Sequence, residues 1–103
     1  MKNNSYNAFF SNFANKTRIK IISWIEQKPS SVGEISKNIN EEQSKISHHL
    51  KKLRDCGIVE FEKKGKERIY RLNKKTVIPL LDIVKKHIQT KCCSKCKNKC
   101  LCE

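Results

Sequence analysis

The 103-residue sequence contains no run of 18 apolar residues, so no transmembrane helix is expected. Its first seven residues are polar and lack the apolar stretch of a secretion signal, so we expect a cytoplasmic protein. There is no P-loop, no G-x-S-x-G motif and no Cys/His pair that reads as a catalytic site, so we do not expect an enzyme. At this length we do not expect a catalytic domain beside a binding domain.

Acidic residues are scarce as well. Ten Asp and Glu stand against 23 Lys and Arg, which gives a net charge of +13 at pH 7. Such an excess repels itself, and a polyanionic partner such as DNA, RNA or an anionic membrane surface offsets the repulsion. Because 19 of the 23 basic residues are Lys, which a biased genome composition can also produce, the positions of the charges must decide between these partners.

Cysteine is nearly absent from the first ninety residues, where Cys56 stands alone. The other five crowd into eleven residues at the end: Cys92, Cys93, Cys96, Cys100 and Cys102. A disulfide framework spreads its cysteines along the chain to close long loops, and this distribution does not. It indicates a metal, metalloid or redox site instead.

Four helices are predicted in the first half of the chain. The first covers residues 6–13 and has one apolar face of Tyr6, Phe9, Phe10 and Phe13. The second runs over residues 16–27 after the N-cap Asn15 and stops at Pro29 and Ser30, with Ile19, Ile22 and Ile25 pointing inward. The third is short, at residues 32–37, with Ile35 and Ile39 turned to the core.

The fourth helix is predicted to begin near Glu41 with Asn40 as its cap and acidic residues in its first turn. Its apolar stripe is Ile46, Leu50 and Leu53, and Gly57 ends it. The opposite face carries small hydroxyls, an imidazole and ammonium groups, which suit contact with base edges and phosphates: Ser44, Ser47, His48, Lys51 and Lys52. Gln43, at the helix start, suits a bidentate contact to adenine.

A β-hairpin is predicted next, with strands at residues 58–62 and 68–72 joined by residues 63–67. Its basic residues Lys63, Lys64, Lys66 and Arg68 are placed to contact phosphates or the minor groove. A last helix begins around Lys75, tolerates Pro79 in its first turn, and carries a stripe of Val77, Leu81, Val84 and Ile88.

The order helix, helix, helix, helix, strand, strand, helix predicts a mainly α winged helix-turn-helix fold with a β-hairpin wing. We expect residues 5–90 to form the DNA-binding and dimerisation domain, and residues 91–103 to form a tail rich in cysteine and lysine. The aromatic stripe of the first helix and the stripe of the last helix exceed the needs of one small core, which favours a homodimer.

Three segments resemble the ArsR/SmtB family of metal-responsive repressors. N-K-T-R-I-K-I-I at residues 15–22 is similar to the family's D-P-T-R-L-x-I-L, and Q-S-K-I-S-H-H-L-K-K-L-R at residues 43–54 is similar to its S-Q-S-x-V-S-H-H-L-x-x-L-R. K-G-K-E-R-I-Y-R-L at residues 64–72 resembles its wing. The resemblance implies that Gln43, Ser44, Ser47 and His48 contact double-stranded DNA. It also implies a homodimer, formed by the first and last helices, on an operator with an inverted repeat.

The resemblance also implies release from DNA by a bound ion. The family's C-x-C site in the third helix is missing, since residues 30–34 hold no cysteine, and of its last-helix site only His87 matches. Cys92, Cys93 and Cys96 resemble the cysteines of arsenic-responsive members, with Cys100 and Cys102 in addition.

Thiolates suit Zn, Cd, Cu(I) or As(III), and the neighbouring lysines favour the thiolate form. A redox-sensing dithiol and a structural zinc remain alternatives. Cys56 is expected to be a buried structural thiol, with a ligand role beside His49 as the less favoured interpretation. His87 is assigned to the dimer interface, with a role as an auxiliary ligand as the less favoured interpretation.

Overall fold

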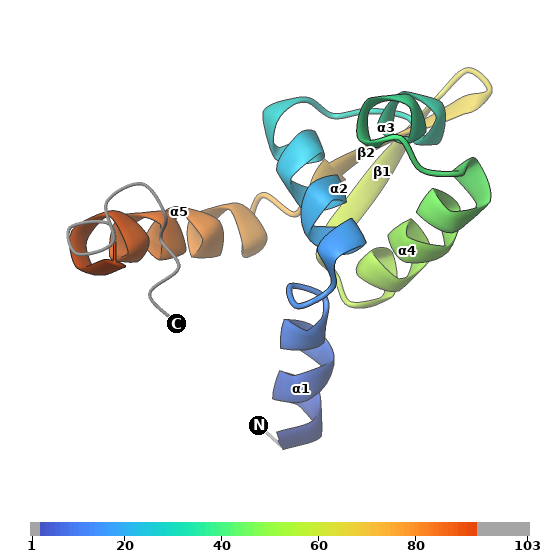
Figure 1. Ribbon diagram of the computed structural model, residues 1–103. Coiled ribbons are helices and arrows are strands. Elements are labelled where there is room, and N and C mark those ends of the chain that lie inside the picture. The colour runs from blue at the N-terminus through green and yellow to red at the C-terminus, as the bar shows by residue number, and fades with distance from the viewer. Residues whose placement is uncertain (1–2, 93–103) are drawn as a thin grey trace. The chain divides into compact units, whose positions relative to one another are not determined.

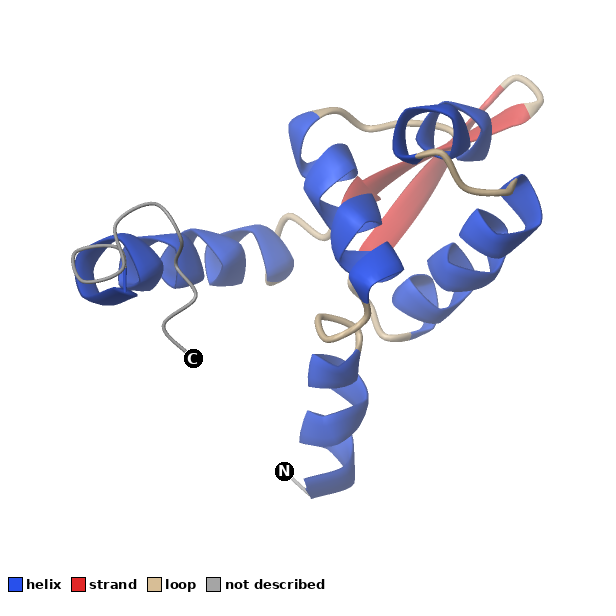
Figure 2. Cartoon of the chain, in the orientation of Figure 1, coloured by secondary structure: helices blue, strands red, loops and turns tan. Residues whose placement is uncertain are grey.

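The computed structural model describes residues 3–92 (Figure 1). The chain divides into two compact units, residues 1–73 and residues 74–103, and each is described by itself. The first unit contains, in order, α1 (Asn3–Ser11), α2 (Lys16–Gln27), α3 (Val32–Ile39), α4 (Gln43–Asp55), β1 (Val59–Lys64) and β2 (Glu67–Leu72). The second contains α5 (Val77–His87) and a π-helical turn (Ile88–Cys92). This element order confirms the predicted winged helix-turn-helix class (Figure 2).

Helix α2 forms the centre of the core, and its predicted bounds are confirmed. The side chain of Asn15 accepts a hydrogen bond from the Arg18 backbone N–H at 3.0 Å and so caps the helix. Ile21, Ile22 and Ile25 are buried. The prediction that Ile19 points inward was wrong, because at 3.6 residues per turn Ile19 lies on the flank of the face that those three side chains define.

The boundary between α3 and α4 differs from the prediction. Asn40 is not the N-cap of α4. It ends α3 in the left-handed conformation, with φ 58°, which asparagine tolerates better than most residues. Helix α4 therefore starts at Gln43, two residues later than expected, and has no acidic residue in its first turn. Its predicted stripe of Ile46, Leu50 and Leu53 is confirmed, since all three are fully buried.

The end of α4 also corrects one expectation. Gly57 has φ 75° and follows the helix, which confirms its predicted role. Cys56, expected to be buried, is exposed. It occupies the C-cap position one residue beyond the last helical residue, Asp55, where the chain turns away from the core stripe.

The hairpin strands are longer and the turn is tighter than predicted. Lys64 pairs with Glu67, so the loop contains only Gly65 and Lys66 instead of five residues. Gly65 has φ 63° at the first loop position, the position that a type II′ turn reserves for glycine. Ser30, which the sequence indicated only as a helix stop, forms a β-bridge with Tyr70 through two backbone hydrogen bonds of 3.1 and 2.8 Å.

The second unit is helical in its described part. Helix α5 begins at Val77 rather than near Lys75, and Pro79 falls in its first turn, where a missing N–H costs little. Ile83 is 64% exposed, and Val84, a member of the predicted stripe, is also exposed. Within the described residues, no helix is long and apolar enough to cross a membrane.

Candidate nucleic-acid interface

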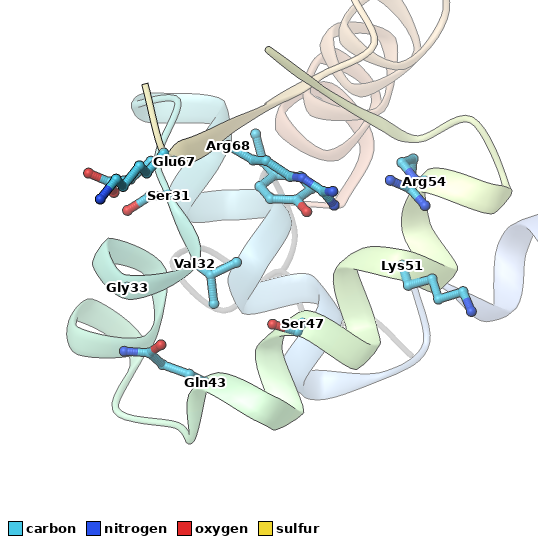
Figure 3. Close-up of a pocket in the computed structure, with 11 residues that line it drawn as sticks. Ser31, Val32, Gly33, Gln43, Ser47, Lys51, Arg54, Glu67 and Arg68 are labelled. Carbon is cyan, nitrogen blue, oxygen red and sulfur yellow. The ribbon is translucent and has the colours of Figure 1, made fainter. Parts of the chain in front are cut away.

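A cleft of about 580 Å³ opens between α4, the start of α3 and the tip of the hairpin (Figure 3). We call it the α4–wing cleft. Its lining residues come from all three elements: Ser31, Val32, Gly33, Gln43, Ser47, Lys51, Arg54, Lys66, Glu67, Arg68 and Tyr70. Ser31 holds the first turn of α3 in a capping box with Glu34, in which each side chain accepts a hydrogen bond from the other's backbone N–H.

One face of α4 supplies a row of polar side chains to this cleft. Gln43, Ser47, Lys51 and Arg54 recur at intervals of four, four and three residues, so they share a face of the helix. Ser47 and Lys51 extend from the α4 ribbon in Figure 3. Three of these four residues were predicted to contact DNA. Ser44 and His48, predicted beside them, are exposed but are not among the lining residues.

The hairpin has two faces of different character. The register places Lys63 directly opposite Arg68, and both share a face with Phe61 and Tyr70. We call this the inner face. Lys64 falls one residue further along the strand and therefore points to the other side, the outer face, where it forms an ion pair with Glu62 at 3.8 Å. Of the four predicted wing cations, Lys66 and Arg68 line the cleft, whereas Lys63 and Lys64 do not.

Two arginines of the cleft rest on one aromatic ring. The guanidinium carbons of Arg68 and Arg54 lie 4.7 and 5.3 Å from the centroid of Phe61. Such cation–π contacts hold a guanidinium in place without neutralising its charge. Arg54 was missed by the sequence reasoning, although its position on the Gln43, Ser47 and Lys51 face was available as a signal.

The cations of the cleft are not paired with carboxylates in the described residues. In the part of the chain that the structure describes, Lys51, Arg54, Lys66 and Arg68 form no salt bridge. Glu67 is the one carboxylate among the lining residues. The cleft therefore offers a concentration of positive charge with hydroxyl and amide groups beside it, an arrangement that suits a polyanion with hydrogen-bonding groups.

Residues 15–60, from the cap of α2 into β1, match the family of bacterial regulatory proteins described as the arsR family. The chain is 33% identical over 69 residues to the HTH-type transcriptional regulator NmtR of Mycobacterium tuberculosis, and the match covers 67% of this chain and 58% of NmtR. It is 32% identical over 79 residues to the uncharacterized HTH-type transcriptional regulator Rv0081 of the same species, which covers 76% of this chain and 69% of Rv0081. The chain belongs to the arsR family.

Solved structures agree with this assignment. The crystal structure of Rv0081 superposes with a TM-score of 0.71 at 29% identity, over 80% of this chain and 83% of that one. The homodimeric winged helix-turn-helix DNA-binding domain of Mb0332 from Mycobacterium bovis gives a TM-score of 0.76 at 22% identity, over 85% and 82% of the two chains. The family consists of transcription regulators, which confirms the prediction that this arsR-family chain is not an enzyme.

The two adjacent histidines of the arsR-family motif have different environments. His48 is exposed, whereas His49 is only 8% exposed and its Nδ1 accepts a hydrogen bond from Arg18 Nε at 3.1 Å. Burial, together with the positive charge of Arg18, lowers the pKa of His49. His49 is therefore held as a neutral imidazole inside the protein, while His48 is available at the surface.

The predicted metal ligands fall at the edge of the described residues or beyond it. Cys92 ends the π-helical turn, and Cys93, Cys96, Cys100 and Cys102 lie outside the described residues. Within residues 3–92, no group of three or more His, Cys, Asp and Glu is placed to hold a metal ion. In the less favoured pairing of His49 with Cys56, the imidazole is buried and already bonded to Arg18, whereas the thiol is exposed.

Proposed function

We propose that this arsR-family regulator is a repressor that binds double-stranded operator DNA with the α4–wing cleft and the adjoining surface of α4. The observation that carries the proposal is the set of unpaired cations in the cleft: Lys51, Arg54, Lys66 and Arg68. Unpaired cations gain from phosphates without first breaking a salt bridge. Acting on chromosomal DNA, the protein would work in the cytoplasm.

In this proposal α4 enters the major groove and the hairpin follows the neighbouring backbone. Gln43, Ser44, Ser47 and His48 read base edges, since their short or planar polar side chains can approach them closely. Lys51 and Arg54 contact phosphates, as do Lys63, Lys66 and Arg68 on the wing. Lys64 points to the outer face, so we assign it a weaker, long-range contribution.

We further propose that the regulator works as a homodimer on an operator with an inverted repeat. Tyr6 and Phe10 of α1 are 49% and 53% exposed, and Ile83 and Val84 of α5 are exposed. Exposed apolar side chains of this size, on α1 and separately on α5, favour a protein interface on each helix. Mb0332 is described as homodimeric, which supports the same assembly here. Two copies related by a twofold axis would present two α4 helices to two half-sites.

For release from DNA we propose a thiophilic ion held by the tail cysteines Cys92, Cys93, Cys96, Cys100 and Cys102. Thiolates are soft ligands that select Cu(I), Zn, Cd or As(III), and lysines beside them favour the deprotonated form. A bound ion would supply binding free energy that differs between two arrangements of the dimer, which is what shifts DNA affinity. Reversible oxidation of the same thiols is the second candidate, and a structural zinc is the third.

Mobility shifts with the DNA upstream of the protein's own gene test these proposals together. We expect binding that loses about 10³-fold in affinity between about 50 and about 200 mM salt, as expected for several phosphate contacts in each half of a dimer. A salt-independent affinity, or no preference over random DNA, would overturn the operator proposal.

Release is then tested with As(III), Cd(II), Zn(II), Cu(I) and an oxidant. The control is a chain truncated after Thr90, which should bind DNA but not respond. Normal release of the truncated chain would exclude the tail as the sensor.

A further inference from the structure

A chain of hydrogen bonds connects three helices behind the proposed DNA-reading surface. The Nδ2 of Asn12 donates to the carbonyls of Ala8 and Phe9 at 3.0 and 3.1 Å, at the end of α1. The Oδ1 of Asn12 accepts from Arg18 Nη1 at 2.9 Å. Arg18, in the first turn of α2, donates from Nε to His49 Nδ1 at 3.1 Å in the middle of α4. We call this the Asn12–Arg18–His49 link.

The link lies inside the protein, and it forms only while the His49 ring carries a single proton. Asn12 is 1% exposed and His49 is buried between the core residues of α4. Arg18 is always charged and can only donate hydrogen bonds, so His49 Nδ1 must carry a lone pair, which places the single ring proton on Nε2. A doubly protonated His49 has a donor at both nitrogens and would face Arg18 with a like charge. Protonation of His49 therefore breaks the link.

No charge near His49 compensates for that protonation in the described residues. On α2 the facing group is the Arg18 guanidinium, and the charged or titratable neighbours on α4 are His48, Lys45 and Lys52. Helix α1 carries no charged residue, and Tyr6 is its one titratable side chain. Asp55 and Cys56 line a hollow together with Arg18 and Asn12, but Asp55 makes no salt bridge to Arg18.

We propose that His49 is a proton-sensitive positioning residue of α4: in its neutral form it ties α4 to α2 and α1 in the orientation that binds the operator, and protonation releases α4 from that orientation. The part of this inference that concerns operator binding rests on the proposed DNA-binding function, whereas the Asn12–Arg18–His49 link itself does not. His49 thus has a different task from its exposed neighbour His48, which lies at the surface of α4.

The pH window follows from the direction of the pKa shift. The pKa of His49 is lowered by folding, so the unfolded chain binds its proton more readily than the native chain does. The stability that the tie contributes is fully present above the ordinary histidine pKa of about 6.5. It is lost as the pH falls from that value through the lowered pKa of the native state. Because linkage is reciprocal, operator binding must lower the pKa of His49 further.

Thermal unfolding of the free full-length protein tests the Asn12–Arg18–His49 link in the absence of DNA. The variant His49→Asn keeps an acceptor oxygen close to the Nδ1 position but cannot be protonated, and His48→Asn is the matched surface control. We expect the midpoint of the wild type and of His48→Asn to fall between about pH 7.5 and about pH 5.5 by more than that of His49→Asn. Parallel profiles for all three proteins would overturn the inference.

Operator binding over the same pH range tests the positioning role. In the His48→Asn background, affinity should fall about fivefold or more toward pH 5.5, and adding His49→Asn should remove that fall. If operator affinity still falls toward pH 5.5 in the double variant, His49 is not a positioning residue for operator binding. Absence of operator binding by the wild type at every pH would overturn the proposed function and the positioning role together, while the unfolding profiles would still test whether the Asn12–Arg18–His49 link depends on protonation.

Imidazole NMR titration of the wild-type chain provides a measurement that needs no variant at position 49. We expect the His49 signal to titrate below the ordinary histidine pKa of about 6.5 in the free protein and to move lower still when operator DNA is added. A His49 signal that titrates at or above the ordinary histidine value would overturn the inference even if His49→Asn failed to fold.

Discussion

The two faces of the β1–β2 hairpin lie on the same twelve residues of strand, yet they use their cations in opposite ways. On the outer face Arg71 bonds to Glu60 at 3.0 Å and lies 3.9 Å from Glu62, which also pairs with Lys64. On the inner face Lys63 and Arg68 stand directly opposite each other, and neither forms a salt bridge in the described chain. Like charges in register destabilise a hairpin, so the inner face bears a cost that the outer face avoids.

This difference indicates that the count of basic residues is a poor guide to where a polyanion binds. An arginine that already holds a carboxylate must give up that bond before it gains a phosphate, whereas an arginine resting on Phe61 need not. We therefore assign the DNA contact of the wing to its inner face. Variants that exchange the properties of the two faces test this assignment.

Reversing one charge on each face should give the largest contrast. Arg68→Glu removes a phosphate contact and adds repulsion, so we expect about a 100-fold loss of affinity for operator and random DNA alike. Arg71→Glu should change affinity several-fold less, although it should lower the free energy of unfolding by placing a third carboxylate beside Glu60 and Glu62. Fluorescence anisotropy at fixed salt measures the first effect, and urea unfolding measures the second. Equal losses of affinity would remove the distinction between the faces.

Variants on α4 should separate sequence reading from charge. We expect Ser47→Ala and His48→Ala each to reduce the preference for operator over random DNA by about 1–3 kcal/mol, because these side chains are proposed to meet base edges. Wing variants should leave that preference unchanged while weakening both affinities. Competition assays with unlabelled random DNA give the ratio. A wing variant that altered the preference would mean that the hairpin reads sequence.

The phenyl ring beneath the two arginines should have a smaller effect. Phe61→Leu keeps an apolar side chain but removes the surface on which Arg54 and Arg68 rest, so we expect a loss of about 1 kcal/mol in DNA affinity without any change of net charge. Phe61→Tyr, which keeps the ring, should retain wild-type affinity. If Phe61→Leu bound DNA normally, the ring contacts would be irrelevant to how the guanidinium groups are presented.

Several parts of the fold followed from local sequence signals. Asn15 before an apolar period and Pro29 after it determined both ends of α2, and Gly57 determined the end of α4. The prediction of the α3–α4 boundary was wrong because asparagine is favoured both as an N-cap and in the left-handed conformation that Asn40 adopts here. The β-bridge between Ser30 and Tyr70 joins residues forty positions apart, so the residues around either one do not predict it.

The candidate site was predictable on α4 but not on the wing. Helical periodicity places Gln43, Ser47, Lys51 and Arg54 on one face, and Arg54 lay within the predicted helix, but it was not singled out as a contact residue. On the hairpin, the face of every side chain depends on register, and a shift of one residue exchanges the two faces. The predicted five-residue loop left that register open, so Lys63 and Lys64 were grouped together. The two-residue turn at Gly65 and Lys66 separates them.

Lys64 provides the smallest effect and the closest test of that separation. Its neighbour in sequence, Lys63, has the same side chain but points to the opposite face of the hairpin. Comparing variants of the two residues therefore separates the effect of side-chain orientation from that of charge. We expect Lys64→Ala to change DNA affinity by less than about 0.5 kcal/mol, since an exposed cation already paired with Glu62 contributes only a screened, long-range attraction. Lys63→Ala should cost more and should lower the slope of log affinity against log salt by about one, as the loss of one phosphate contact requires. If the two variants lowered the slope equally, DNA would reach both faces of the hairpin, and the ion pair between Lys64 and Glu62 would open on binding.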